Sequence, residues 1–246
     1  MPILNENQIT KTYFEGIGGF PGLKIIHELQ EYNCGGRACV ACTQLNGEKA
    51  SLIFSGIKTY SERDKKRIQR EWIRYLSSEP TEFKALHFNS HVSQPLFNAT
   101  CCQEALEELR FKWGSYTDLS ALANLKRLRY LYIGSGAGIT DITPLARLER
   151  LVVLHVEGFK KVEDYSPLAN LKNLEQLVIS GPNLGLTPVS DLEFLKDMPN
   201  LRSIWLCNVQ YKKRFSAEEL RGLREQLPAL YDINGCLFGK ANLRSN

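Results

Sequence analysis

A short apolar phrase, Leu-x-x-Leu-x-(Ile/Val/Phe), returns at nearly constant spacing and constrains the fold more than any other feature of the chain. Five clear copies begin at Leu106, Leu128, Leu151, Leu174 and Leu201. The steps between them are 22, 23, 23 and 27 residues. A weaker copy begins at Phe83, and a degenerate copy is expected from Leu227. A period of this length indicates structural units that stack along one axis, each contacting mainly its neighbours.

The segments between these phrases repeat as well. Asp118–Leu125, Asp141–Leu148 and Asp164–Leu171 share the pattern Asp-(Leu/Ile/Tyr)-(Ser/Thr)-(Ala/Pro)-Leu-Ala-(Asn/Arg)-Leu. Together the two patterns resemble the leucine-rich repeat family, in its short bacterial, internalin-like type. The resemblance covers residues 80–234 and implies an α/β solenoid of about six to seven units with one parallel strand per unit on a concave sheet. One position departs from the family, which usually has Asn there: it holds Gly114, Gly136, Phe159, Pro182 and Val209.

Residues 1–80 lack the repeat and are predicted to form a small αββα-like N-terminal capping unit, because the end of a solenoid must be covered. Helical spacing predicts a helix over Leu23–Tyr32. Asn46-Gly47 predicts a hairpin between Arg37–Leu45 and Ala50–Ile57, and Ser61 with Asp64 predicts a capped second helix.

At the other end, Ser216 and Glu219 predict a capped amphipathic helix, after which Leu230–Phe238 closes the core. The expected organisation is therefore a cap over 1–80, a solenoid with its C-terminal cap over 81–238 and a flexible tail over 239–246. Gly181–Pro188 is predicted to be a loop insertion on one rim.

The composition is that of an ordinary globular protein. In 246 residues with 43% hydrophobic content there is ample material for a buried core, and the net charge of +4 permits an acidic partner without demanding one. No apolar run is long enough to cross a bilayer, and the first residues lack the basic and apolar regions of a secretory signal. Seven cysteines form no regular framework. We therefore expect a cytoplasmic protein with reduced thiols and no membrane contact.

One cysteine cluster, Cys34-x4-Cys39-x2-Cys42, has the spacing of plant-type ferredoxin ligands. A strand through this segment would direct Cys39 and Cys42 to opposite faces, and Arg37 stands where that loop has a small residue. We therefore expect no metal and no cofactor. A metal or redox protein that uses this cluster remains the less favoured alternative.

Catalytic machinery is not evident in the sequence. Cys207 and His155 lie two repeats apart, about 10 Å along the sheet, so they cannot form a nucleophile–base dyad. The basic run Arg63–Arg74 is interleaved with acidic residues and predicts a solvated helix face rather than a nucleic-acid site. We expect neither an enzyme nor a nucleic-acid-binding protein.

The repeat register predicts which side chains face outward from the concave sheet. In the row at the fifth position of each phrase, His87, Arg110, Tyr132, His155 and Trp205 stand out, because Tyr, Trp and Arg dominate protein-binding hot spots. The candidate protein-binding residues are His87, Arg110, Lys112, Trp113, Tyr130, Tyr132, Val153, His155, Glu157 and Trp205. A competing interpretation is that some of these rings pack on each other across strands.

The most concrete function that fits is a non-enzymatic module that occludes another protein with its concave face. A bacterial immunity protein that neutralises a toxin is the sharpest version, and a general scaffold or adaptor is the alternative. The sequence leaves the partner and the oligomeric state open.

Overall fold

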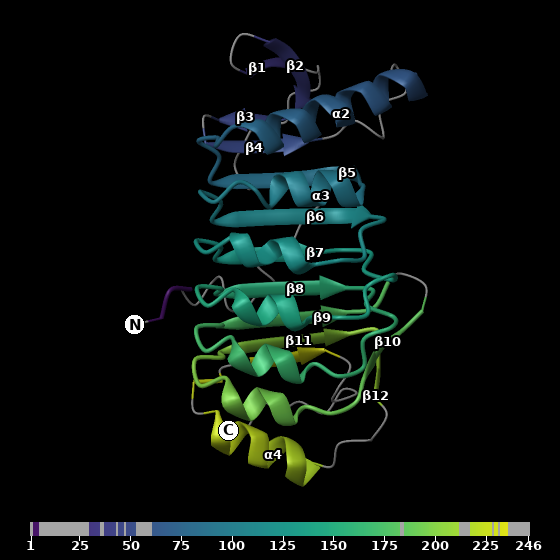
Figure 1. The fold of residues 1–246 in the computed structure, drawn as a ribbon. Coiled ribbons are helices and arrows are strands. Elements are labelled where there is room, and N and C mark those ends of the chain that lie inside the picture. The colour runs from purple at the N-terminus through teal and green to yellow at the C-terminus, as the bar shows by residue number, and fades with distance from the viewer. Residues whose placement is uncertain are drawn as a thin grey trace.

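The computed structural model describes residues 2–4, 30–34, 37–42, 44–46, 48–52, 61–182, 185–211, 217–227, 229–230 and 232–235. Within them a nine-stranded sheet runs the length of the molecule in the order β13-β11-β9-β8-β7-β6-β5-β4-β3 (Figure 1). Its strands are β3 (Gln44–Asn46), β4 (Lys49–Leu52), β5 (Ala85–Val92), β6 (Glu108–Gly114), β7 (Tyr130–Ile133), β8 (Val153–Glu157), β9 (Gln176–Ser180), β11 (Ser203–Cys207) and β13 (Asp232–Gly235). All neighbouring strands are parallel except β3 and β4.

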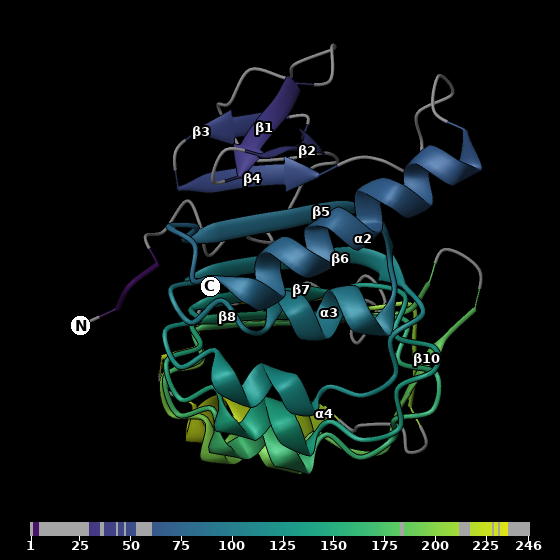
Figure 2. The same cartoon turned by 45° about the horizontal axis from the view of Figure 1, so that its top comes forward.

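Short helices cover one face of this sheet and stack on one another in the same order as the strands (Figures 1 and 2). They are α3 (Gln94–Thr100), the 3₁₀ helices Ser120–Asn124, Thr143–Arg147, Ser166–Asn170 and Glu193–Asp197, and α4 (Ala217–Gln226). The repeated Asp explains the 3₁₀ turns. In the copy at Asp141, for example, the carboxylate Oδ1 accepts a hydrogen bond from the backbone N–H of Thr143 at 2.8 Å, which fixes the first turn.

The apolar phrase supplies the core, as the repeat predicts. In the central strands Leu131 pairs with Leu154, and Leu154 with Leu177, and all three side chains are fully buried. One continuous cluster of buried apolar side chains extends from Ala50 to Leu230. No unit could bury its leucines alone, so each repeat depends on its neighbours. The solenoid expected from the sequence is confirmed.

The N-terminal region differs in part from its prediction. β1 (Gln30–Cys34) and β2 (Arg37–Cys42) form an antiparallel hairpin, so the predicted helix Leu23–Tyr32 is wrong at its last three residues, and residues 23–29 lie outside the described part. Backbone pairing with the alternating strand Arg37–Cys42 overrides the helical spacing there.

The predicted hairpin at Asn46-Gly47 is present between β3 and β4, but its first arm is shorter than the predicted Arg37–Leu45, because Arg37–Cys42 pairs with β1 instead. The sequence did not reveal that β4 then pairs in parallel with β5, with Ala50 opposite Leu86 and Leu52 opposite Phe88. The sheet of the solenoid therefore continues into the first 80 residues.

Helix α2 (Glu62–Ser78) has the predicted capping box: the Asp64 N–H donates to Ser61 Oγ at 3.2 Å, and the Ser61 N–H donates to the Asp64 carboxylate at 3.3 Å. Ile68, Trp72 and Leu76 are buried in the same core cluster as the repeats. Trp72 fills the space against Phe83, with ring centroids 6.4 Å apart. Among the described residues, no helix is both long and apolar enough to cross a membrane.

At the C-terminal end, α4 confirms the predicted helix, and β13 adds a further parallel strand. Because Ile233 pairs with Ile204, the degenerate copy begins at Leu230 rather than at Leu227 as predicted. The predicted tail 239–246 lies outside the described residues.

The insertion before the last clear copy adds a short strand, β10 (Thr187–Val189). It pairs in parallel with β12 (Val209–Tyr211), which directly follows β11 in the sequence. These two strands form a second small sheet at the edge where the main strands end (Figure 1).

Gly134 lies where two successive units pack closely, so substituting it tests the packing between units. A Cβ on Gly134 would lie 2.1 Å from the backbone carbonyl oxygen of Lys112 in the preceding unit. We expect Gly134→Ala to lower the free energy of unfolding by about 1–3 kcal/mol in urea titrations, because backbone must shift to admit the methyl group. Gly222→Ala in α4 is the matched control: a Cβ there meets nothing within 4 Å, and stability should rise by up to about 1 kcal/mol. Equal effects of the two changes would contradict this account of the packing.

Candidate functional site

The outward rows of the concave sheet have the register that the repeat predicts. In the fifth-position row, His87 lies beside Arg110, Arg110 beside Tyr132, and Tyr132 beside His155 on successive strands. The row continues through Val178 to Trp205. In the third-position row, Tyr130 lies beside Val153. The ladder thus brings into rows residues that are about 23 positions apart in the sequence.

The ten predicted site residues differ in exposure. Trp113 is 40% exposed, and five others are half-buried: Lys112, Tyr130, His155, Glu157 and Trp205. The remaining four, His87, Arg110, Tyr132 and Val153, lie in the predicted outward rows but are buried by their neighbours. Their role in binding stays a prediction.

Tyr132 is the centre of a cross-strand network. Its ring meets the His155 ring edge-on at a centroid distance of 4.5 Å, and the Arg110 guanidinium lies 5.1 Å from its centroid. Its hydroxyl donates a hydrogen bond to the Glu157 carboxylate. The competing interpretation, that rings pack on each other across strands, therefore holds for this pair. Burial, followed by the interaction with Glu157, raises the pKa of the Tyr132 hydroxyl well above its usual range.

A second buried polar pair lies two strands away. His87 Nε2 is 2.6 Å from a carboxylate oxygen of Glu108 on the neighbouring strand. Burial nevertheless keeps the pKa of His87 below its ordinary value, against the opposing pull of Glu108. A polar pair at this depth holds the two strands in one register, because a one-residue slip would separate the groups.

His155 shares a 3.0 Å hydrogen bond between its Nε2 and the Ser180 hydroxyl on the next strand. This is a histidine–hydroxyl contact that the sequence did not reveal. A catalytic triad also needs a third group that orients the histidine, and the buried Nδ1 of His155 has no hydrogen-bond partner among the described residues. Burial, with a smaller contribution from Arg110, lowers the pKa of His155 to about 3, so the ring is a weak base at neutral pH.

Cys207 is placed two strands from His155, as the register predicts. It pairs with Ser180 on β9, while His155 belongs to β8. The sheet therefore separates the thiol from the imidazole, and the two do not meet as a dyad.

The N-terminal residues bind at the edge where the strands begin. The backbone N–H groups of Ile3 and Leu4 donate to the Glu175 carboxylate at 2.5 and 2.9 Å. Arg202 Nη1 bonds both this carboxylate, at 3.1 Å, and the Leu4 carbonyl, at 2.5 Å. The Leu4 side chain packs on Val152 and Val153 in a small separate apolar cluster, which explains why Val153 is buried. Contacts across about 170 residues of sequence leave no local signal, so sequence reasoning missed this clamp.

Among the described residues, no group of three or more His, Cys, Asp or Glu side chains could hold a metal ion. Cys101, Cys102 and Cys207 are free thiols. The backbone of Cys34, Cys39 and Cys42 lies in the β1–β2 hairpin, and their side chains lie outside the described part. The metal alternative at this cluster therefore stays untested.

Acid should weaken the fold through the two desolvated histidines. In the folded protein both histidines have pKa values below that of a histidine in an unfolded chain, which is about 6.5. As the pH falls, the unfolded chain therefore binds protons before the folded protein does, and the free energy of unfolding decreases below about pH 6.5. Between pH 6 and 5, His155→Gln should reduce the slope of unfolding free energy against pH by about 1 kcal/mol per pH unit, measured by urea titration. Ser180→Ala should retain the slope, because burial is the main cause of the shift. A slope unchanged in His155→Gln would refute the assignment.

Comparison with known proteins supports the fold alone. No family model and no curated protein matches the sequence. An internalin (inlF) of Listeria monocytogenes matches in structure with a TM-score of 0.55 and 21% identity, over 77% of this chain and 48% of its own. Internalin C2 of the same organism matches with a TM-score of 0.43 and 21% identity, over 78% of this chain and 85% of its own.

The chain spans about half the length of the first of these internalins. The likeness agrees with the repeat phrases in the sequence and with the parallel strand and 3₁₀-helix units of the structure. Together these findings show that the chain folds as a leucine-rich-repeat solenoid of the internalin-like type.

Proposed function

We propose that this chain is a non-enzymatic protein-binding module that contacts its partner through the concave sheet face and the exposed Trp113 beside it. The observation that carries the proposal is the gathering of large aromatic and charged side chains in the fifth-position row. Tyr132, Arg110 and His155 interlock there, and the half-buried Trp205 continues the row. Rigid aromatic side chains with polar handles offer large contact area at a low entropy cost.

The network around Tyr132 has a specific part in this proposal. Its side chains are already held by neighbours on other strands, so little conformational freedom remains to be lost when a partner binds. We therefore assign Tyr132, Arg110 and His87 to the support of the face. The accessible contacts are Trp113, Trp205 and the half-buried residues between them.

Trp113 extends this surface at the edge where the strands end. It is 40% exposed, and its ring meets the His91 ring edge-on at 5.1 Å. The contact orients the indole and leaves much of its apolar area open. An accessible and oriented Trp is the residue type that most often dominates binding energy.

In its sharper form, we propose a cytoplasmic immunity protein that occludes a toxin, with a scaffold or adaptor as the alternative. An occluding inhibitor needs one rigid face and no chemistry of its own. The concave face described above offers such a rigid surface. His155, which is uncharged and a weak base at neutral pH, is poorly suited to proton transfer. A scaffold or adaptor would instead bind its partner without blocking the partner's activity.

Co-expression separates the two versions of the proposal. In the native host, a toxin gene should neighbour the gene for this chain. When the neighbouring product is expressed in a susceptible strain, this chain should restore growth. Binding to a partner without any effect on growth would favour the scaffold, and a neighbouring product that neither binds nor harms cells would exclude the immunity version.

The face can be tested by removing its two accessible indoles. Trp113→Ala with Trp205→Ala should weaken binding to a copurified partner by about tenfold or more, measured by calorimetry, because aromatic anchors carry much of an interface's energy. Tyr132 is a poor choice for this test, because it is buried and its loss would disturb the sheet.

Leu186→Ala is the matched control for this variant. Leu186 is 50% exposed on the inserted rim loop, and its truncation should leave affinity unchanged. If both variants bind as the parent does, the partner contacts another face and the proposal for the concave surface fails.

A further inference from the structure

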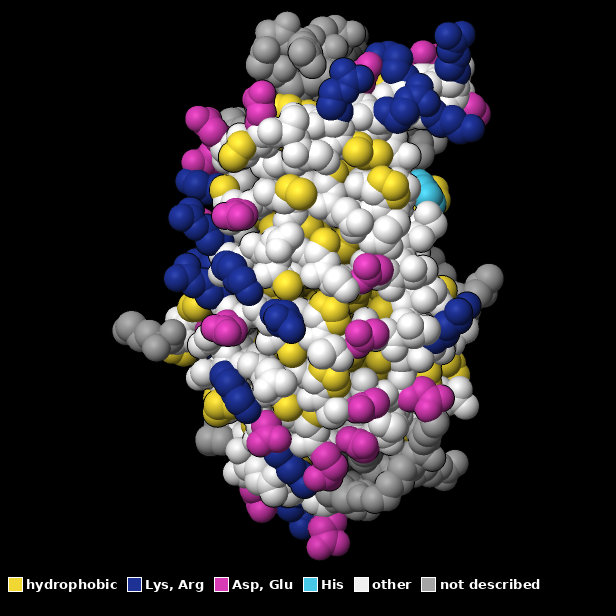
Figure 3. All heavy atoms as spheres, viewed as in Figure 1, with side chains coloured by type: hydrophobic (Ala, Val, Ile, Leu, Met, Phe, Trp, Pro, Cys, Tyr) yellow, Lys and Arg dark blue, Asp and Glu magenta, His cyan; other side chains and the backbone are white. Residues whose placement is uncertain are grey.

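A basic groove opens on the edge of the solenoid where strands β7 and β8 begin, away from the fifth-position row. It encloses a volume of about 730 Å³, and five of its seven lining residues are Lys or Arg. Figure 3 shows Lys and Arg side chains gathered along this edge of the molecule. The cations of the groove are Lys126, Arg127, Arg129, Arg147 and Arg150.

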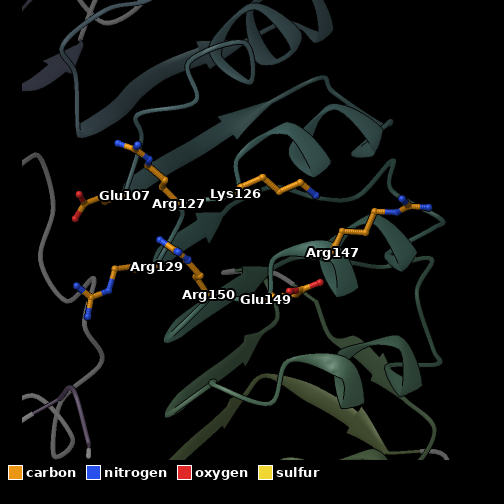
Figure 4. Close-up of a pocket in the computed structure, with 7 residues that line it drawn as sticks. All are labelled: Glu107, Lys126, Arg127, Arg129, Arg147, Glu149 and Arg150. Carbon is orange, nitrogen blue, oxygen red and sulfur yellow. The ribbon is translucent and has the colours of Figure 1, made fainter.

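The repeat itself builds the groove. Arg127 and Arg150 are 23 residues apart and occupy the same position in successive units, in the loop between a 3₁₀ helix and the next strand. Figure 4 shows their side chains running in the same direction from two adjacent loops, while Lys126 and Arg147 extend the other way. The stacking of units therefore places like charges beside one another, and the solenoid geometry fixes their spacing.

The charge of the groove is not balanced within the molecule. Five cations and the two carboxylates Glu107 and Glu149 leave a net charge of 5 − 2 = +3. Arg129 lies 5.6 Å from the centroid of the Tyr130 ring. In the described part of the chain, the other four cations make no ion pair and no side-chain hydrogen bond. Crowded like charges repel one another, so an anionic ligand would relieve a cost that the free protein carries.

The basic face of α2 also carries cations without an ion pair, so the lack of a partner is not unique to the groove. There Lys65 is paired with Glu62 and Arg67 with Glu71, whereas in the described part of the chain Lys66 and Arg70 make no ion pair. These cations lie along one helix, as is typical of a solvated helix surface. The groove is distinguished by its shape, because its cations line one hollow and come from two adjacent units (Figure 4).

We propose that this groove binds an acidic peptide segment of a protein partner. Arginine guanidinium groups bind carboxylates through paired N–H donors, and they come here from two adjacent loops (Figure 4). The carboxylates of Glu107 and Glu149, which also line the groove, favour an acidic peptide over a nucleic-acid strand as the ligand. A peptide presents backbone N–H donors and occasional basic side chains to these carboxylates, whereas a nucleic-acid strand presents uninterrupted phosphate to them.

The assignment goes beyond the proposed function, because it names a second surface and the chemistry of what it binds. Through the contact of Arg129 with Tyr130, the groove adjoins the third-position row of the concave face. A partner seated on the face could thus extend an acidic segment over the edge. The variants that test the groove and those that test the concave face substitute different residues, so either proposal can be refuted while the other stands.

A labelled Glu-rich peptide is the direct probe, followed by fluorescence anisotropy with the full chain at low ionic strength. Arg127→Glu with Arg150→Glu should weaken binding by about tenfold or more, because two favourable pairs become repulsive. Both residues are exposed, so the fold should be unaffected, which circular dichroism and thermal unfolding check. Arg127→Lys with Arg150→Lys should retain most of the affinity, and added salt should abolish it.

The matched control reverses the same number of charges on α2. Lys66→Glu with Arg70→Glu changes the net charge equally at two exposed positions outside the groove and should leave peptide binding unchanged. The proposal is overturned if the α2 variant loses as much affinity as the groove variant. It is also overturned if the parent does not bind the peptide, if a Gln-for-Glu peptide binds equally well, or if a single-stranded oligonucleotide of equal charge binds the groove more tightly.

Discussion

The parallel backbone ladder between successive units is the interaction on which the rest of the structure depends. Each unit has one short strand and one row of leucines, and neither can be satisfied within the unit, because backbone groups need a neighbouring strand and the leucines need a neighbouring core. Pairing such as Leu131 with Leu154 meets both needs at once. The ends of the array are then the critical places. At the N-terminal end, the β3–β4 hairpin extends the sheet while α2 continues the core through Trp72.

The same ladder explains the unusual electrostatics of the outward rows. Because the register is set by the inward leucines, the residues between them meet as neighbours whatever their chemistry. His155, Arg110 and Tyr132 are brought together in this way, and their packing removes water from groups that would otherwise be charged or solvated. The lowered pKa values of His155 and His87 are the consequence. Polar groups held this tightly make a rigid surface, which suits recognition better than proton transfer.

Two surfaces of different chemistry result from one repeat. The strand positions produce the aromatic row, and the loops before the strands produce the basic groove with Arg127 and Arg150. They meet where Arg129 lies over Tyr130. Apolar area gives affinity and charge gives orientation and speed of association, so adjoining surfaces of these two kinds suit a single protein partner.

The sequence by itself determined the period, the register, the inward leucines and the outward rows, together with the capped helix α2 and the turn at Asn46-Gly47. These follow from local rules, since side chains alternate along a strand and caps act within a few residues. Only the tertiary structure decided the features that join distant segments: the parallel pairing of β4 with β5, the β1–β2 hairpin in place of a helix through Tyr32, and the Leu4 clamp over Val153. It also decided that Tyr132 and Arg110 are buried and that unpaired cations face one groove. Burial and charge balance depend on everything that packs nearby, and a one-dimensional pattern does not contain that information.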